Sequence, residues 1–310
     1  MIKLKITYIT FFTLCMLSTI DLFAEKQLSA LLIDLSHVDS KVRHDAVVAI
    51  GRLGDTQGID PLILQLADPE YAVRGAAVDA LGVLRAHKAQ HEIMHLLTSD
   101  PHEEVRQYAA IALRSLGDAT AADVLIEALS DEHEGTRHEV IKTIGKLRIT
   151  NGRDHIRGLL GDKNPLIRES SLSVLGSIGD ASVIEAVTRS LRDREFRVRM
   201  EAARTLGKLN AQDSVSELKK SLKDSHEEVS LAAAVSLAMM HNDSGKKTAQ
   251  TYLEHTDPLM RKTAVEVFKL IGKKKDIGEL KFMQENDPVR SVQSAARRAI
   301  ASIHERYPDN

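Results

Sequence analysis

The sequence predicts an all-α protein, a right-handed α-solenoid of about nine helix pairs. Three observations predict this fold class: a helical phrase recurs every 31 or 32 residues, the apolar positions recur with it, and turn signals divide each repeat. Each repeat opens on a β-branched or otherwise apolar residue, usually followed by Arg. The openings are Val42, Val73, Val105, Thr136, Ile167, Val198, Val229, Met260 and Val292.

Residues 1–24 have the layout of a secretory signal peptide. A basic start at 1–5 precedes an uncharged, mostly apolar run at 6–20, which is shorter than the about 20 residues that a membrane span needs. We therefore expect export to the periplasm or the medium, cleavage after Ala24, and no stable membrane insertion afterwards. Cleavage removes Cys15, the one cysteine, so the mature chain has no disulfide.

Residues 25–310 are expected to form a single repeat domain of globular composition, with 43% hydrophobic and 28% charged residues. The formal net charge of −2 argues against a general nucleic-acid binder, which usually carries a basic excess. Aromatic residues make up 4% and Trp is absent, which is too sparse for base stacking. A protein or peptide is therefore the expected partner.

The first helix of each repeat is predicted from its apolar face. Counted from the opening residue, positions +8 and +11 are apolar in all nine repeats and position +4 is small in most, as on one face of an α-helix. Apolar residues near +20 and +24, such as Leu125 and Leu129, predict a second helix. Gly closes the first helix in four repeats, where a positive φ is expected: Gly54, Gly117, Gly179 and Gly272.

An Asp recurs five residues before the opening residue, where we expect it to cap the first helix. In Asp100-Pro101-His102-Glu103 the Glu is expected to complete a capping box, with Pro in the first turn. In five consecutive repeats an Arg follows this Asp by six residues, which predicts a ladder of charge-assisted hydrogen bonds between adjacent repeats. The pairs are Asp68/Arg74, Asp100/Arg106, Asp131/Arg137, Asp162/Arg168 and Asp193/Arg199.

With these motifs, residues 37–306 resemble a HEAT-like repeat protein of the short type named after phycobilisome lyases. The signature of that type is close to Asp-x-x-x-x-Val-Arg-x-x-Ala-Ala-x-x-Leu-Gly-x-Leu-Gly-Asp. The resemblance fades in repeats seven and nine, where Ser230 and Gln293 replace Arg. It implies an α-solenoid, and the family name alone implies bilin lyase activity, for which no distinct motif occurs.

A second resemblance is to deoxyhypusine hydroxylase, whose di-iron ligands are His-Glu pairs two and three residues after the opening residue. His44-Asp45 and His138-Glu139 occupy these positions, and the other seven repeats lack the pair. Two pairs three repeats apart are too distant to share a metal centre, because packed helices lie about 8–10 Å apart. The missing pairs and this distance therefore argue against hydroxylase activity in this protein.

His91-Glu92-Ile93-Met94-His95 matches the His-Glu-x-x-His pattern of zinc peptidases, in which two His on one helical face hold zinc. The repeat register already explains Ile93 as a core residue, and no third ligand can be placed from the sequence. A solvated polar face is the main interpretation, and metal binding by His91 and His95 is the alternative.

The second helices carry residues near +18, +21 and +22 that no core position explains. We predict that this ridge is the concave, partner-binding surface, with an apolar part followed by a cationic part. An ordinary solvated face is the alternative. The predicted binding residues are Ile63, Leu64, Met94, Ile126, Arg157, Arg189, Lys219, Lys220 and Lys247.

The expected function is a non-enzymatic scaffold that binds a protein or peptide, with no catalytic residue and no cofactor. A metal- or bilin-dependent enzyme of the lyase or hydroxylase type, using His91 and His95, is one alternative. A passive structural spacer in the cell envelope is the other.

Overall fold

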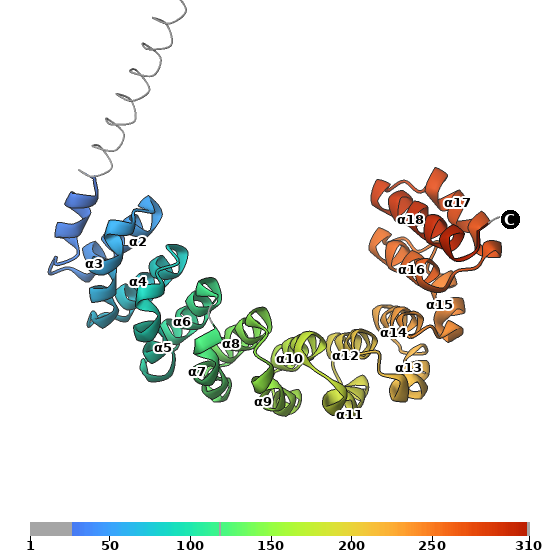
Figure 1. Ribbon diagram of the computed structural model, residues 1–310, viewed down its shortest axis with the longest axis horizontal. Helices are drawn as coiled ribbons and strands as arrows, with labels where there is room; N and C mark the ends of the chain where they lie inside the picture. Colours follow the sequence, from blue (N-terminus) through green and yellow to red (C-terminus); the bar gives the residue numbers. More distant parts are fainter. Residues whose placement is uncertain (1–26, 118, 309–310) are drawn as a thin grey trace, which may run out of the picture. The chain divides into compact units, whose positions relative to one another are not determined.

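The computed structural model describes residues 27–117 and 119–308 (Figure 1). Every regular element in these ranges is helical, as predicted, and successive helices stack on one another. Contacts divide the chain into unit 1, residues 1–147, and unit 2, residues 148–310. The predicted signal peptide lies outside the described residues.

Unit 1 alternates long first helices with shorter second helices, after a helix at 27–34. The first helices are α2 (Ser40–Leu53), α4 (Tyr71–Val83), α6 (Glu103–Leu116) and α8 (Glu134–Leu147). The second helices are α3 (Ile59–Leu64), α5 (Gln90–Ser99) and α7 (Ala122–Glu127). Short 3₁₀ turns flank them: η1 (Thr56–Gly58), η2 (Gln65–Ala67), η3 (His87–Ala89), η4 (Ala119–Ala121) and η5 (Ala128–Ser130).

Unit 2 continues the same alternation. Its first helices are α10 (Pro165–Ile178), α12 (Phe196–Lys208), α14 (Glu227–Met239), α16 (Pro258–Ile271) and α18 (Arg290–Arg306). Its second helices are α9 (Arg153–Gly158), α11 (Ile184–Arg189), α13 (Val215–Ser221), α15 (Lys246–Thr251) and α17 (Ile277–Asn286). Its 3₁₀ turns are η6 (Thr150–Gly152), η7 (Leu159–Gly161), η8 (Ala181–Val183), η9 (Ser190–Arg192), η10 (Gln212–Ser214), η11 (Asp243–Gly245) and η12 (Lys274–Asp276).

The predicted +8 positions form the centre of the core. They are buried in the first eight repeats, and only Ile300 of the ninth is half-buried. Leu113 and Phe268 are each 1% exposed. The residues at +11 are buried or half-buried. This is expected for the last turn of a first helix, which packs on the second helix of the same repeat.

Small residues bring successive first helices into close contact. A Cβ at Gly82 of α4 would lie 3.0 Å from Ala112 Cβ of α6, and one at Gly207 of α12 would lie 2.8 Å from Ser236 Oγ of α14. Within each unit, successive first helices pack closely against one another, whereas successive second helices make few contacts. The first-helix side of the stack is therefore the shorter one.

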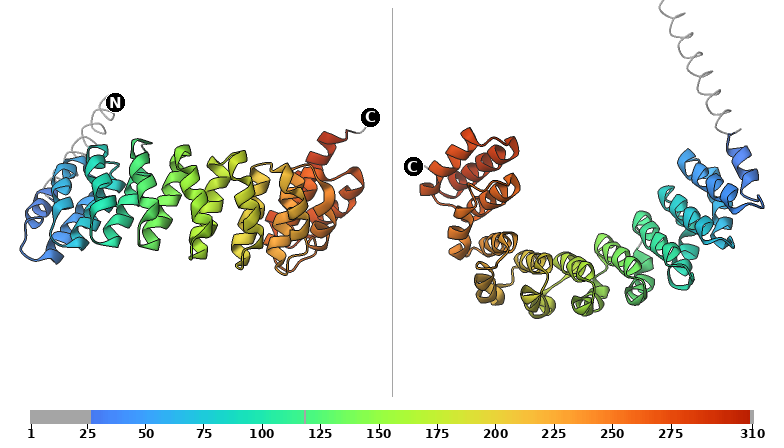
Figure 2. Two further views of the ribbon diagram at one scale, coloured as in Figure 1. Left: turned by 90° about the horizontal axis from the view of Figure 1, so that it is seen from below. Right: turned by 180° about the vertical axis from the view of Figure 1, so that it is seen from behind.

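Within each unit, the first helices form an inner layer and the second helices an outer layer (Figures 1 and 2). The prediction that the second helices line the concave surface is therefore wrong. The reason is the Gly and Ala contacts described above, which shorten the inner layer and let the second helices spread apart.

The capping prediction is also wrong in its details. Asp100 lies in the turn before α6, which begins at Glu103 with His102 as N-cap and has no side-chain capping bond. The Asp100 carboxylate instead accepts a hydrogen bond from the His102 backbone N–H at 2.9 Å. Pro101 therefore precedes the helix. A Pro in the first turn does occur at α10 and α16, which Asn164 and Asp257 cap.

Of the four predicted C-terminal glycines, two adopt a positive φ, Gly54 at 75° and Gly117 at 73°. Gly179 and Gly272 have extended backbones. Steric crowding explains glycine there, because a Cβ at Gly179 would lie 2.3 Å from the carbonyl oxygen of Leu175. In the described ranges the left-handed conformation also occurs at Arg85, Arg148, Asn210 and His241.

Candidate binding surfaces

An Arg–Asp ladder connects adjacent repeats within each unit. Arg74 donates to both carboxylate oxygens of Asp100 at 2.6 and 2.9 Å, and to the carbonyl oxygen of Asp68 at 2.9 Å. Arg74 thus holds the Asp of the next repeat by its side chain and the Asp of its own repeat by the backbone. The same side-chain pairing joins Arg43 to Asp68, Arg106 to Asp131, Arg168 to Asp193, Arg199 to Asp224 and Arg261 to Asp287.

The paired Arg and Asp side chains of the ladder are shielded from solvent. Burial raises the pKa of the Asp193 carboxyl, but hydrogen bonds from Arg168 and the Glu195 backbone outweigh it, and the pKa lies below its usual value. Arg137 donates to the carbonyl oxygens of Asp131 and Glu132. Bidentate pairs with a backbone partner fix the angle between repeats, which is a structural role.

The predicted apolar binding residues lie on three outer helices of unit 1. Leu64 at the end of α3 is 75% exposed, whereas Ile63, Met94 of α5 and Ile126 of α7 are half-buried. Their side chains contribute partly to the packing of the second helices. Leu64 is the member of this group that is free to contact a partner.

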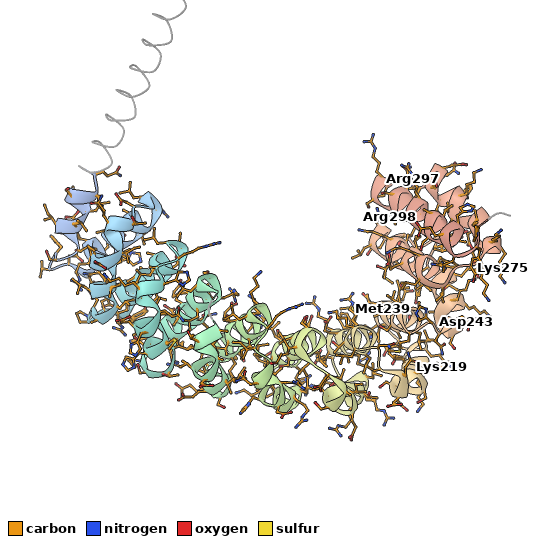
Figure 3. The ribbon with its side chains drawn as sticks, viewed as in Figure 1. Lys219, Met239, Asp243, Lys275, Arg297 and Arg298 are labelled. Carbon is orange, nitrogen blue, oxygen red and sulfur yellow. The ribbon has the colours of Figure 1, made fainter. Side chains whose placement is uncertain are left out.

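The predicted basic residues lie on the outer layer of unit 2, and Lys219 is seen there in Figure 3. Arg157 forms an ion pair with Asp154 at 3.1 Å, Arg189 with Glu185 at 2.7 Å, and Lys220 with Glu217 at 2.5 Å. Lys219 and Lys247 are exposed. The structure brings Arg157 and Arg189 together at one cleft between α9 and α11.

His91 and His95 lie on the exposed face of α5. No group of three or more His, Cys, Asp or Glu side chains is placed to hold a metal ion in the part of the chain that the structure describes. Metal binding by the two His stays a prediction.

The His138-Glu139 pair of α8 lies among cations. Glu139 accepts hydrogen bonds from Arg114 at 2.6 Å and Lys142 at 2.8 Å. Burial raises the pKa of Glu139, but these two bonds outweigh it and the pKa is lowered. Burial and nearby Lys142 lower the pKa of His138. The Glu139 carboxylate is therefore engaged in ion pairs within unit 1.

The inner layer of unit 2 holds an apolar groove that the sequence analysis missed. It has a volume of about 410 Å³ and runs between α12, α14 and α16. Its apolar lining includes Phe196, Met200, Leu231, Val235, Leu259 and Met260, and its charged lining is Glu169, Arg197, Arg204 and Glu228. We call these residues the inner groove.

One exposed apolar side chain lines the inner groove, and a second lies beside it. Leu259 is 64% exposed, and Met239, further along α14, is 40% exposed. Figure 3 places Met239 on the inner side of unit 2, together with Arg297 and Arg298 of α18. From 229 to 240 the chain has no charged residue, whereas the neighbouring first helix α12 has Arg204 on its inner side. This uncharged stretch was the sequence signal for the groove.

The family model for HEAT repeats matches residues 28–114, 91–157, 153–238 and 215–301. The chain belongs to the HEAT-repeat family. The match covers most of the described residues, and the repeats of this family commonly mediate protein interactions. No curated protein matches the sequence significantly. Within the described residues, no helix has the length and apolar character needed to cross a bilayer.

Two solved structures share the fold at low identity, and a third is similar over part of the chain. An engineered protein matches at 20% identity over 89% of this chain and 88% of that chain, with a TM-score of 0.58. YibA of Escherichia coli matches at 18% identity over 82% of this chain and 95% of that chain, with a TM-score of 0.59. The complex of CpcE and CpcF of phycocyanin lyase from Nostoc matches at 20% identity over 72% and 92%, with a TM-score of 0.45.

Proposed function

We propose that this HEAT-repeat protein is a non-enzymatic scaffold that binds another protein in the inner groove of unit 2. The observation that supports the proposal is the uncovered apolar surface around α14, where Leu259 and Met239 are open to solvent beside a hollow of about 410 Å³. Most exposed apolar side chains are scattered singly, but Leu259 lines the same hollow as the half-buried Met200 and Val235.

The occupant that fits the inner groove is an amphipathic segment of a partner protein. Covering apolar surface contributes roughly 25 cal/mol per Å², so a few apolar side chains provide most of the binding free energy. Arg197 and Arg204 on α12 and Glu228 on α14 give the lining both signs of charge. A segment with an apolar stripe and mixed flanking charges therefore complements this surface.

This proposal moves the principal docking surface from the outer layer to the inner layer. On the outer layer of unit 1, the predicted apolar residues other than Leu64 are half-buried in the packing of the second helices. The arrangement of residues 1–24 supports export of the protein, which would place the partner in the periplasm or outside the cell.

The proposal is tested with peptides selected from a random library on the full-length chain. Their affinities are measured for the native chain and for Leu259→Lys and Val235→Lys, with Leu64→Lys as the matched control on the outer layer. We expect the two inner-groove variants to weaken binding about tenfold or more, because each places a charge against an apolar segment. Equal affinity for the native chain and both inner-groove variants would contradict the proposal.

A further inference from the structure

The outer layer of unit 2 holds a second cleft, distinct from the inner groove. It lies between α9 and α11 and has a volume of about 450 Å³. Arg157 comes from α9, Arg189 from α11 and Arg192 from η9, while Gly158 and Gly161 contribute no side chain. We call this the arginine cleft.

Two glycines open the arginine cleft. In the next two repeats the position of Gly158 is occupied by Arg189 and Lys220, and that of Gly161 by Arg192 and Lys223. A Cβ at either glycine would meet no atom within 4 Å, so the space beside them is empty of protein. The repeat that contains Gly158 and Gly161 thus provides the space of the cleft. The repeat that follows it provides two of the cations, Arg189 and Arg192.

The three guanidinium groups keep donors for a ligand. Arg157 and Arg189 pair with carboxylates of their own helices, and Arg192 pairs with Glu217 at 2.8 Å. The side chains of Arg189 and Arg192 are 70% and 74% exposed, so these pairs contribute little and can exchange for another carboxylate. Each guanidinium has five N–H donors, and one carboxylate engages at most two of them.

Each carboxylate at the arginine cleft already has a basic partner, so an incoming carboxylate would bind by exchange with the exposed pairs of Arg189 and Arg192. Asp193 lies at the cleft but is held by both Arg168 hydrogen bonds at 2.7 Å, as a member of the ladder. Asp154 is engaged by Arg157. The cationic row continues on α13 and just beyond it with Lys219, Lys220 and Lys223, all exposed.

We infer that the arginine cleft is a binding site for an acidic peptide segment, with Asp or Glu carboxylates of the segment taking bidentate hydrogen bonds from Arg157, Arg189 and Arg192. The site lies in the layer opposite the inner groove, so it stands whether or not the proposed function is correct. Arginine forks match carboxylates in geometry as well as in charge, which favours a peptide carboxylate over a diffuse ion atmosphere.

The test measures fluorescence anisotropy of a labelled Glu-rich peptide with the full-length chain, against a Gln-rich peptide of equal length. Three variants are compared with the native chain. Arg157→Gln/Arg189→Gln removes the bidentate donors, and Gly158→Gln fills the cleft without changing the charge. Arg297→Gln/Arg298→Gln on α18 removes two exposed arginines elsewhere, as the matched control (Figure 3). Thermal melts confirm that all variants fold.

We expect the first double variant to weaken binding of the Glu-rich peptide about tenfold or more, and Gly158→Gln to weaken it by about fivefold or more. The control should stay within about twofold of the native chain, and added salt should weaken native binding. Equal loss in the control, unchanged binding in Gly158→Gln, no preference for the Glu-rich peptide, or stronger binding of a single-stranded oligonucleotide would each overturn the inference. Leu259→Lys should leave this binding intact, which separates it from the inner groove.

Discussion

Gly207 of α12 packs against Ser236 of α14 so closely that a Cβ at 207 would lie 2.8 Å from the serine Oγ. Ser236 Oγ in turn donates to the carbonyl oxygen of Ala203 at 2.8 Å. Thr205 makes the same bond to Leu172, and Thr143 makes it to Ala110. A hydroxyl on one first helix thus bonds the backbone of the previous one, and a small residue lets the two approach.

Replacing Gly207 by Ala should destabilise the protein by about 1–3 kcal/mol, because the added methyl group has no room against α14. The matched control is Gly278→Ala on α17, where a Cβ would meet no atom within 4 Å. That change should stabilise the helix by about 0.5–1 kcal/mol. Urea unfolding measures both, and effects of the same sign would contradict the packing described.

Removing a ladder carboxylate should be far more costly than removing an exposed one. Asp193→Ala leaves the buried Arg168 without its ion pair and the Glu195 backbone N–H without its acceptor. We expect a loss of about 3–5 kcal/mol in the free energy of unfolding. Glu185→Ala, which breaks the exposed pair with Arg189, should change it by less than about 1 kcal/mol. Similar losses from both changes would show that the ladder pair contributes no more to the free energy of unfolding than an exposed ion pair.

The ladder also predicts loss of stability in acid. Hydrogen bonds from Arg199 and Arg261 are the main causes that hold the pKa values of Asp224 and Asp287 below the usual value of 3.8. A lowered carboxyl pKa stabilises the fold above the unfolded-state pKa, and this contribution disappears as the pH falls through the folded-state pKa. The urea concentration at the midpoint of unfolding should therefore decrease when the pH is lowered below about 4. Asp287→Asn should reduce that drop; an unchanged profile would argue against the ladder as its source.

Helix ends offer an independent check of the backbone. Gly117 has φ 73° and Arg85 has φ 50°, both at the end of a first helix. Gly117→Ala should destabilise by about 1–2 kcal/mol, since a Cβ disfavours the left-handed region. Arg85→Gly should be neutral or stabilising for the same reason. Thermal unfolding of the two variants measures the difference, and stabilisation by Gly117→Ala would be the opposite of what this backbone requires.

The repeat period and the core were predictable because they depend on residues within one repeat, such as Leu113 and Leu116. The residues at which the helices start were not predictable. Asp100 was expected to cap a helix, but its carboxylate is bound by Arg74, 26 residues earlier in the chain. The direction of curvature was missed for a related reason. It depends on contacts such as Gly207 with Ser236, which become visible only when two repeats are packed together.

The binding surfaces were predicted in part. Arg157 and Arg189 were identified as second-helix residues that no core position explains, and both line one cleft. The role of Gly158 was missed because an absent side chain gives no signal in a search for functional groups. The inner groove was missed because residues that no core position explains were sought on the second helices. Val235 stands where α12 has Arg204, and comparing these two positions between repeats would have indicated it.

The most direct test of the proposed scaffold function places a photo-crosslinking benzoylphenylalanine at Leu259 of the inner groove or at Leu64 of the outer layer, in the full-length protein in its native cells. Both side chains are exposed, at 64% and 75%, so the two probes are matched in accessibility. We predict that irradiation links the probe at 259 to one discrete partner protein and that the probe at 64 gives no such product. A discrete product from 64 alone, or none from either position, would contradict binding in the inner groove.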